Sequence, residues 1–129
     1  MIRLLLVDDQ PAVLQGLRMR LELERDLVVA GEAGDGQTAV GLAITQSPDV
    51  VVLDLDMPGM DGLATAAALR SLTPSAAVVI LSIHDEIAVR HRALAVGATA
   101  FVEKTGEIEL LLEAIRRAAQ GVLRAADTS

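Results

Sequence analysis

Three carboxylates and one ammonium follow short apolar runs of this sequence and have the chemistry to bind a phosphoryl group. They are Asp8, Asp9, Asp54 and Lys104. Lys104 is the only lysine among 11 lysine and arginine residues, so a compact point charge is favoured at this position where arginine is used elsewhere. Acids and one compact cation at strand ends are typical of a metal-dependent phosphoryl site. The sequence therefore predicts a phosphorylation switch.

A divalent cation is expected among the three aspartates. Carboxylates that lie close together repel one another and raise each other's pKa values unless a cation neutralises them. Mg²⁺ fits best, because it binds a few carboxylates, keeps waters and leaves coordination positions for phosphate oxygens. The alternative is that Asp8 and Asp9 only cap the helix that follows them, which accounts for one aspartate better than for two.

Composition limits the classes of protein and partner. A chain of 129 residues is expected to form one domain, which buries about two thirds of its unfolded surface. Hydrophobic residues make up 52% of the chain and aromatic residues 1%, so the core must be aliphatic. The net charge of −7 disfavours direct binding of this segment to nucleic acid or to an anionic membrane. The sequence contains no cysteine and shows neither a membrane span nor a signal peptide, so we expect a cytoplasmic protein.

Apolar runs alternate with amphipathic segments along the chain, which predicts an α/β fold. Most of the expected strands lack polar alternation, which is typical of strands buried on both faces. They are Ile2–Val7, Leu27–Ala30, Val50–Leu53, Ala77–Leu81 and Ala98–Val102. The expected helices are Pro11–Glu24, Gln37–Gln46, Leu63–Leu72, Glu86–Val96 and Glu107–Gln120. This alternation predicts a (βα)5 three-layer sandwich with a parallel, flavodoxin-like five-stranded sheet of order 2-1-3-4-5.

The ends of the elements have recognisable signals. Pro11 suits a first helical turn, and Gly97 and Gly121 are expected to cap helices at their C-terminal ends. On the last helix Glu113 and Arg117 are spaced to form an ion pair on the outer face. We expect a domain over residues 1–121 and a linker or C-terminal tail over residues 122–129.

In this fold class, ligands bind beyond the carboxyl ends of the strands, between the first and third strands. Asp8 and Asp9 follow the first strand and Asp54 follows the third. Ser82 follows the fourth strand, where its hydroxyl is placed to donate to a phosphoryl oxygen; alone, it would be taken for a hydroxyl bonded to backbone. Likewise Lys104 alone would be taken for a solvated charge. The combination favours a functional site.

The motifs that contain these residues are specific. They are Leu-Val-Asp-Asp at 6–9, Asp-Leu-Asp-Met-Pro-Gly-Met-Asp-Gly at 54–62, Ile-Leu-Ser at 80–82, Gly-Ala at 97–98 and Phe-Val-Glu-Lys at 101–104. Over nearly its whole length the chain resembles the receiver domain of response regulators in two-component signalling. The resemblance implies that Asp54 accepts a phosphoryl group from a phosphohistidine of a sensor histidine kinase. Asp9 and Asp54 would bind Mg²⁺ directly, Asp8 would bind it through water, and the backbone carbonyl of Asp56 would also be a ligand.

The resemblance also assigns a switch to Ser82 and Phe101. Phe101, the only phenylalanine, would turn inward as Ser82 shifts toward the phosphoryl group, although the alternative is a half-buried residue that only packs well. Without a hydroxyl its movement must depend on packing. The output face would consist of the helix Glu86–Val96, the strand around Phe101 and the helix Glu107–Gln120.

Further segments are similar to the NarL/LuxR-type subfamily, whose members usually continue into a helix-turn-helix domain. These segments are Gly-Glu-Ala-Gly-Asp-Gly at 31–36, Ser-Ile-His-Asp at 82–85 and Lys-Thr at 104–105. DNA would then be bound only through a C-terminal domain outside this chain, and homodimer formation is left open. Many receivers have a proline with a cis peptide bond at the position of Thr105, so a cis bond cannot be assumed here.

Two other functions remain as alternatives. A haloacid-dehalogenase-type phosphohydrolase also has an Asp-x-Asp motif after an apolar strand, and Asp54 and Asp56 fit that pattern. That class, however, needs its nucleophile near the start of a longer chain and its acid pair downstream. The other alternative is a receiver-like interaction module that acts without phosphorylation.

Overall fold

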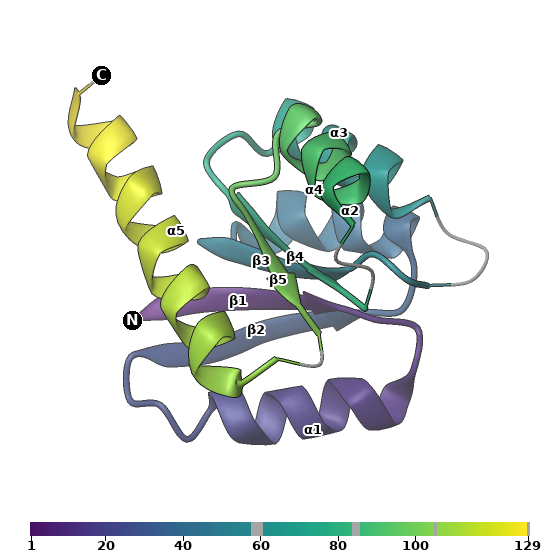
Figure 1. The fold of residues 1–129 in the computed structure, drawn as a ribbon. Helices are drawn as coiled ribbons and strands as arrows, with labels where there is room; N and C mark the ends of the chain where they lie inside the picture. Colours follow the sequence, from purple (N-terminus) through teal and green to yellow (C-terminus); the bar gives the residue numbers. More distant parts are fainter. Residues whose placement is uncertain (58–60, 84–85, 105, 129) are drawn as a thin grey trace.

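A parallel sheet lies between two layers of helices (Figure 1). The computed structural model describes residues 1–57, 61–83, 86–104 and 106–128, with side chains described as far as residue 121. Over these ranges the sheet has five strands in the order β2-β1-β3-β4-β5, and every neighbouring pair is parallel. The predicted α/β fold class, flavodoxin-like strand order and alternation of strands and helices are confirmed.

The element bounds lie close to those predicted, except for the end of the last helix. The strands are β1 (Ile2–Val7), β2 (Leu27–Ala33), β3 (Val50–Asp54), β4 (Ala77–Ser82) and β5 (Ala100–Glu103). The helices are α1 (Pro11–Leu21), α2 (Gly36–Gln46), α3 (Gly62–Leu72), α4 (Ile87–Ala95) and α5 (Ile108–Thr128). Because β3 and β4 each extend to a polar residue, Asp54 and Ser82 are the last residues of neighbouring strands.

Alternate residues of the central strands pack against opposite helical layers. Leu4 and Leu6 of β1 belong to the core cluster that α1 and α5 cover, whereas Leu5 and Val7 belong to the cluster on the side of α2, α3 and α4. All four are almost completely buried. Each large aliphatic side chain that is removed from water in this way contributes roughly 1.5–3 kcal/mol. The aliphatic core therefore holds the strand ends, and the polar residues on them, in fixed register.

Gly97 ends α4 as predicted and also delays the start of β5. It has φ 104°, a left-handed conformation that favours glycine. The Gly97 amide donates to Leu94 O and the Ala98 amide donates to Ala93 O, which is the hydrogen-bond pattern of a Schellman motif. Ala98 is therefore part of the helix end, and the prediction that β5 begins there is wrong.

The prediction that Gly121 ends the last helix is also wrong, because α5 continues to Thr128. A glycine inside a helix costs about 1 kcal/mol relative to alanine, which a long helix tolerates. Earlier in α5, Leu111, Leu112 and Ile115 are buried against the sheet and fix its direction. The assignment of residues 122–129 to a linker or tail is a separate question and stays a prediction.

Salt bridges hold α5 in place on its outer side. Arg116 donates to Asp26 and Glu24 in the segment between α1 and β2, at N–O distances of 2.8 Å. These contacts raise the pKa of Arg116 and lower the pKa values of Glu24 and Asp26. The predicted pair between Glu113 and Arg117 is confirmed at 2.6 Å.

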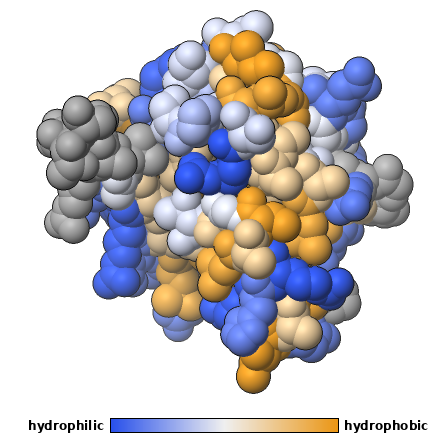
Figure 2. All heavy atoms as spheres, turned by 90° about the horizontal axis from the view of Figure 1, so that it is seen from above, coloured by the Kyte–Doolittle hydropathy of each residue, from blue (hydrophilic) through white to orange (hydrophobic). Residues whose placement is uncertain are grey.

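Apolar residues on the surface are scattered among polar ones. Figure 2 shows this mixture on the face seen from above the view of Figure 1. The large apolar side chains that remain exposed include Met19 on α1, Ile44 on α2 and Leu94 on α4, which belong to different elements. Among the residues that the structure describes, no helix is both long and apolar enough to span a membrane.

Candidate phosphoryl-acceptor site

The structure brings the three predicted carboxylates together at the carboxyl ends of β1 and β3. One oxygen from each of Asp8, Asp9 and Asp54 lies within 4.8 Å of the others. Asp8 and Asp54 are buried, with 1% and 4% of their surfaces exposed, whereas Asp9 is open to solvent. Two buried acids and one exposed acid form an oxygen-rich cluster that a hard cation can reach from water. This donor set fits Mg²⁺, which prefers oxygen ligands and retains several waters.

Lys104 approaches this cluster from the end of β5. Its Nζ donates to Asp54 Oδ2 at 2.8 Å and to Asp8 Oδ2 at 3.4 Å. The Lys104 amide donates to Ser82 O at 2.8 Å, so the backbone that carries the ammonium is fixed to the end of β4. Burial of Lys104 opposes its charge, but the two carboxylates outweigh that effect and raise its pKa. Lys104 therefore remains an ammonium and partly neutralises the cluster.

The two oxygens of Asp8 have different partners. Oδ1 accepts a hydrogen bond from the Gln10 amide at 2.9 Å, and Oδ2 faces Lys104. Burial is the main cause that raises the pKa of Asp8, and Asp54 raises it further. Gln10 itself is the N-cap residue of α1 and makes no side-chain capping bond. The capping alternative thus accounts for one oxygen of Asp8 and for neither of the contacts made by Lys104.

Asp54 is held by one backbone donor and one charged donor. The Asp56 amide donates to Asp54 Oδ1 at 3.0 Å, while Oδ2 accepts from Lys104. The Leu55 amide donates to Leu81 O at 2.8 Å, which continues the pairing of β3 with β4 beyond the last strand residue. The Asp54 carboxylate therefore has a fixed orientation at the carboxyl end of the central strand β3.

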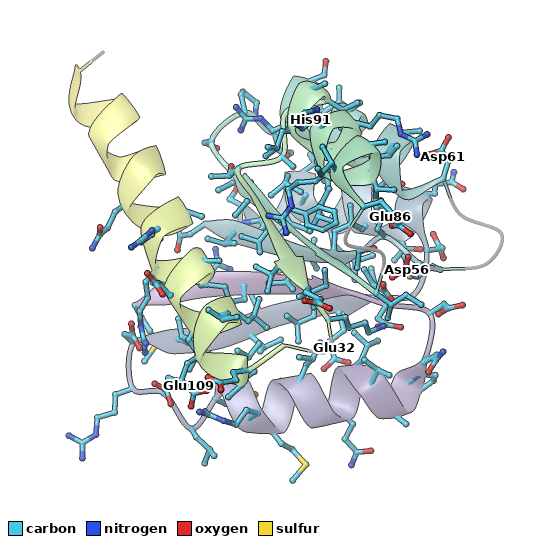
Figure 3. All side chains as sticks on the ribbon, viewed as in Figure 1. Glu32, Asp56, Asp61, Glu86, His91 and Glu109 are labelled. Carbon is cyan, nitrogen blue, oxygen red and sulfur yellow. The ribbon has the colours of Figure 1, made fainter. Side chains whose placement is uncertain are left out.

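Ser82 is completely buried at the end of β4, and its hydroxyl donates to the side chain of Asp56, a partner that was not predicted from the sequence. Ser82 Oγ donates to Asp56 Oδ1 at 3.2 Å, and the Ile83 amide donates to Asp56 Oδ2 at 2.6 Å. Figure 3 places Asp56 at the edge where the strands end. Only the backbone carbonyl of Asp56 had a predicted role. No sequence signal marks its side chain, because the contact depends on the register in which Asp54 pairs with Leu81 and Asp56 lies beside the residues that follow.

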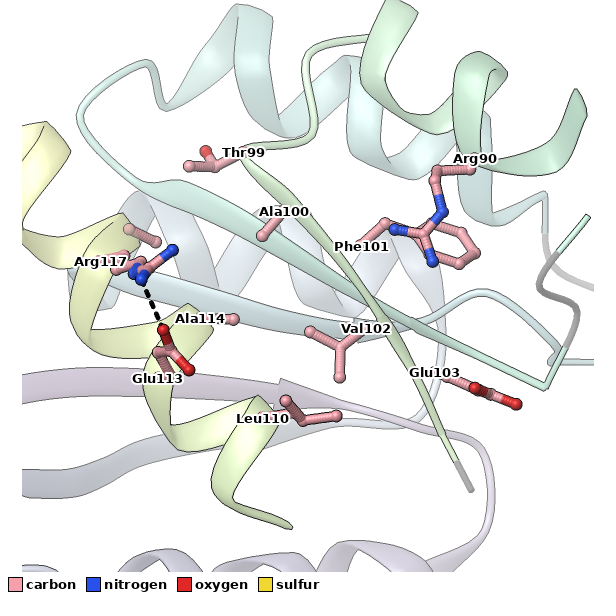
Figure 4. Close-up of a pocket in the computed structure, with 11 residues that line it drawn as sticks. Arg90, Thr99, Ala100, Phe101, Val102, Glu103, Leu110, Glu113, Ala114 and Arg117 are labelled. Atoms are coloured by element: carbon pink, nitrogen blue, oxygen red, sulfur yellow. Dashed lines mark ion pairs between the residues drawn. The ribbon is translucent and has the colours of Figure 1, made fainter. Parts of the chain in front are cut away.

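Phe101 is buried on β5, with 8% of its surface exposed, and it belongs to the core cluster beneath α4. The guanidinium of Arg90 on α4 lies over the ring, 4.9 Å from its centre (Figure 4). A cation above an aromatic face is attracted by the ring's quadrupole, so packing is not the only force on Phe101. The ring borders a groove of about 500 Å³ between α4, β5 and α5. The switch role of Phe101 and Ser82 stays a prediction.

Thr105 and His84, which belong to the motifs identified in the sequence, lie outside the described residues. Within the residues that the structure describes there is no cis peptide bond. Every buried side-chain nitrogen or oxygen in the described ranges has a hydrogen-bond partner. The buried side chains of the candidate site, those of Asp8, Asp54 and Ser82, therefore all have partners within the protein.

Comparison with known proteins gives a consistent result. Residues 4–116 match the family model of the response regulator receiver domain. The nitrate/nitrite response regulator protein NarP of Escherichia coli is 40% identical over 92% of this chain, which spans 55% of that protein. The chain thus spans about half the length of the curated relatives that it matches.

Solved structures agree with this match. The signal receiver domain of response regulator NarL from Mycobacterium tuberculosis is 39% identical, with a TM-score of 0.86 over 93% of this chain and 97% of that one. RcsB from Salmonella enterica serovar Typhimurium, solved bound to promoter rprA with a phosphomimetic beryllofluoride, is 27% identical. Its TM-score is 0.82, over 93% of this chain and 99% of that one.

Proposed function

The chain belongs to the response regulator receiver domain family, of the NarL type, and we propose that it is a phosphorylation switch whose acceptor is Asp54. The observation that carries the proposal is the position of the Asp54 carboxylate. It ends a central strand, with Lys104 on one oxygen and the carboxylates of Asp8 and Asp9 close by. A phosphoryl group at this place would be surrounded by groups that balance its charge.

The proposed reaction transfers a phosphoryl group from a phosphohistidine of a sensor histidine kinase. An oxygen of Asp54 forms a bond to phosphorus, the phosphorus–nitrogen bond of the donor breaks, and the imidazole nitrogen retains the electron pair. The product is an acyl phosphate. Lys104 is placed to balance charge on the phosphoryl oxygens, because its ammonium already contacts Asp54. The Asp56 amide keeps the carboxylate oriented during the attack.

The donor set of the acidic cluster also fits a resident Mg²⁺. We propose Asp9, Asp54 and the backbone carbonyl of Asp56 as direct ligands, with Asp8 acting through water. Bound Mg²⁺ would supply positive charge near the transferring phosphoryl oxygens. The exposed position of Asp9 supports this assignment, because a metal ion that exchanges with solvent needs a ligand that solvent can reach.

Phosphorylation would be transmitted to the face formed by α4, β5 and α5. The Lys104 amide bonds to Ser82 beside the acceptor site, and β4 pairs with β5 from Val79 to Ser82, where Phe101 lies opposite Ile80. Moving a population from 1:99 to 99:1 requires about 5.5 kcal/mol, so one phosphoryl group is expected to give a partial shift. This face includes the groove beside Phe101.

The output would be transcription, in a cytoplasmic response regulator. The relatives are named as transcriptional regulators rather than enzymes, so the chain is not a haloacid-dehalogenase-type hydrolase. We propose that residues 1–121 form the receiver domain, and that residues 122–129 lead toward a DNA-binding domain. Support comes from the length of the relatives and from the promoter in the RcsB structure.

Mass spectrometry after incubation with a small phosphodonor and Mg²⁺ tests the proposal. One labile phosphoryl adduct on Asp54, cleaved by hydroxylamine as an acyl phosphate is and absent from Asp54→Asn, is the expected result. Steady turnover of unrelated phosphoesters would favour a hydrolase. Neither adduct nor turnover in a folded protein would favour a receiver-like module that acts without phosphorylation.

A further inference from the structure

The side chain of Asp56 has no part in the function proposed above, yet within the described residues it accepts two hydrogen bonds at the edge of the site. Oδ1 accepts from the hydroxyl of Ser82 and Oδ2 accepts from the amide of Ile83. The second bond, at 2.6 Å, joins a backbone donor to a carboxylate, a pairing that is stronger than one between neutral groups. The carboxylate is thus anchored to the backbone that immediately follows Ser82.

A serine hydroxyl has only one proton to donate. Ser82 is completely buried, so its hydroxyl cannot turn to bulk water, and in this structure the proton is directed at Asp56. A phosphoryl group on Asp54 requires the same proton for one of its oxygens. Donation to Asp56 and donation to the phosphoryl group therefore exclude each other.

The backbone holds the two acceptors close together. The Asp56 amide bonds to the carboxylate of Asp54, and Asp54 pairs with Leu81, the residue before Ser82. A phosphoryl group on Asp54 thus adds negative charge beside a second carboxylate. Like charges at short range disfavour each other, so the two groups compete for a donor and also repel.

We propose that Asp56 is a positioning residue that holds the Ser82 hydroxyl in the unphosphorylated state and must release it when Asp54 is phosphorylated. The inference rests on the proposed function. Asp56 then opposes phosphorylation, and its carboxylate sets how readily the acceptor site is occupied. The consequence is that removal of the Asp56 side chain tightens binding of a phosphoryl group, and that part of this gain depends on Ser82.

A double-mutant cycle with beryllofluoride and Mg²⁺ tests this dependence. The dissociation constant of beryllofluoride is measured for the wild-type chain, Asp56→Ala, Ser82→Ala and the double variant. We expect Asp56→Ala to tighten binding roughly tenfold in the chain that has Ser82, the scale of a hydrogen bond to a charged group. With Ser82 replaced, the gain should fall to about threefold or less, because only the relief of charge repulsion remains.

Two control variants separate charge from hydrogen bonding. Asp56→Asn removes the charge but keeps an acceptor oxygen for the hydroxyl, so its gain should lie between those of wild type and Asp56→Ala. Glu103→Gln removes an exposed charge next to Lys104 and should leave the dissociation constant nearly unchanged. The proton resonance of the Ile83 amide should move upfield in Asp56→Ala, and much further than in Ser82→Ala, because only Asp56→Ala removes the carboxylate that accepts its hydrogen bond.

The outcomes are distinguishable. An equal gain from Asp56→Ala with and without Ser82 would mean that Asp56 acts through its charge alone, and the inference would be overturned. An unmoved Ile83 amide resonance in Asp56→Ala would show that the hydrogen bond from the Ile83 amide to Asp56 is not formed, and the inference would be overturned. If the wild-type chain binds no beryllofluoride while its spectrum is that of a folded domain, the proposed function itself fails.

Discussion

Replacing Lys104 by methionine tests whether one ammonium balances the acidic cluster. Lys104→Met keeps an unbranched side chain of similar length and removes the charge. In the structure that charge lies 2.8 Å from Asp54 and 3.4 Å from Asp8, both of which are buried. The variant therefore leaves two buried carboxylates beside each other without their cation, and the free energy of unfolding should fall.

The size of the loss follows from the burial of the three groups. Removing one partner of a fully buried ion pair costs about 3–5 kcal/mol. The side chain of Lys104 is 24% exposed, so water screens part of the interaction, and we expect a loss of about 2–3 kcal/mol. For a domain of this size, each kcal/mol shifts the melting temperature by about 4 °C. The melting temperature should therefore fall by about 8–12 °C.

The assay is thermal unfolding at neutral pH and low salt, without and with Mg²⁺. Mg²⁺ should raise the melting temperature more in Lys104→Met than in wild type, since it would supply the missing positive charge. Arg117→Met is the matched control, because Arg117 also forms a short ion pair, with Glu113, but on an exposed helix face. Its melting temperature should change by less than about 2 °C.

A melting temperature for Lys104→Met equal to that of the Arg117→Met control would refute the reasoning. It would mean that the contacts between Lys104 and the two aspartates contribute nothing to the folded state. An identical Mg²⁺ effect in wild type and Lys104→Met would separately refute the claim that the ammonium and the metal ion act on the same cluster.

Three other predictions concern single residues. Asp9→Ala should lose most of the Mg²⁺-induced rise in melting temperature, and a full rise would place the metal ion elsewhere. Burial raises the pKa of Asp8, so the folded protein holds that proton more tightly than the unfolded chain does. Without metal, the stability that this proton contributes should be present at low pH and be lost as the pH rises through the raised pKa. The free energy of unfolding of Asp8→Asn, measured with urea, should lack this dependence on pH. If the wild type and Asp8→Asn gave the same dependence on pH, the raised pKa of Asp8 would not be its cause. Gly97→Ala should lower stability by about 2 kcal/mol, because φ is 104° and the added methyl group would lie 2.6 Å from Arg70 Cγ; an unchanged urea midpoint would show that the turn relaxes.

The fold was largely predictable because each local signal agrees with the whole. The run Ile2–Val7 was predicted as a strand with the bounds that β1 has, and Gly97 was predicted as a helix cap. Both depend on short-range chemistry, namely buried apolar residues and a left-handed turn. The prediction that Gly121 ends the last helix was wrong because a glycine can either end a helix or lie within one, and the surrounding packing decides which.

The site was predictable in position but not in its hydrogen bonds. Placement of Asp8, Asp54 and Lys104 at strand ends follows from the fold class, and the structure confirms that they meet. The bond from Ser82 to the side chain of Asp56 depends on the register of β3 with β4, which a shift of one residue would abolish. Sequence periodicity does not contain that register.

Contacts between elements were missed for the same reason. Arg90 lies over Phe101 on the strand that follows its helix, and Arg116 joins α5 to Asp26, 90 positions earlier in the sequence. A lone arginine on a helix has many partners within reach of its long side chain. Only the relative placement of helix and sheet selects one of them.

Amide resonances recorded with saturating beryllofluoride and Mg²⁺ test the central claim most directly. If occupation of Asp54 shifts the face formed by α4, β5 and α5, then Phe101 and the residues of Ile87–Ala95 should move in wild type. The same resonances should stay in place in Asp54→Asn. Perturbations confined to the residues around Asp54 and Lys104, or identical perturbations in Asp54→Asn, would contradict the account of this domain as a phosphorylation switch.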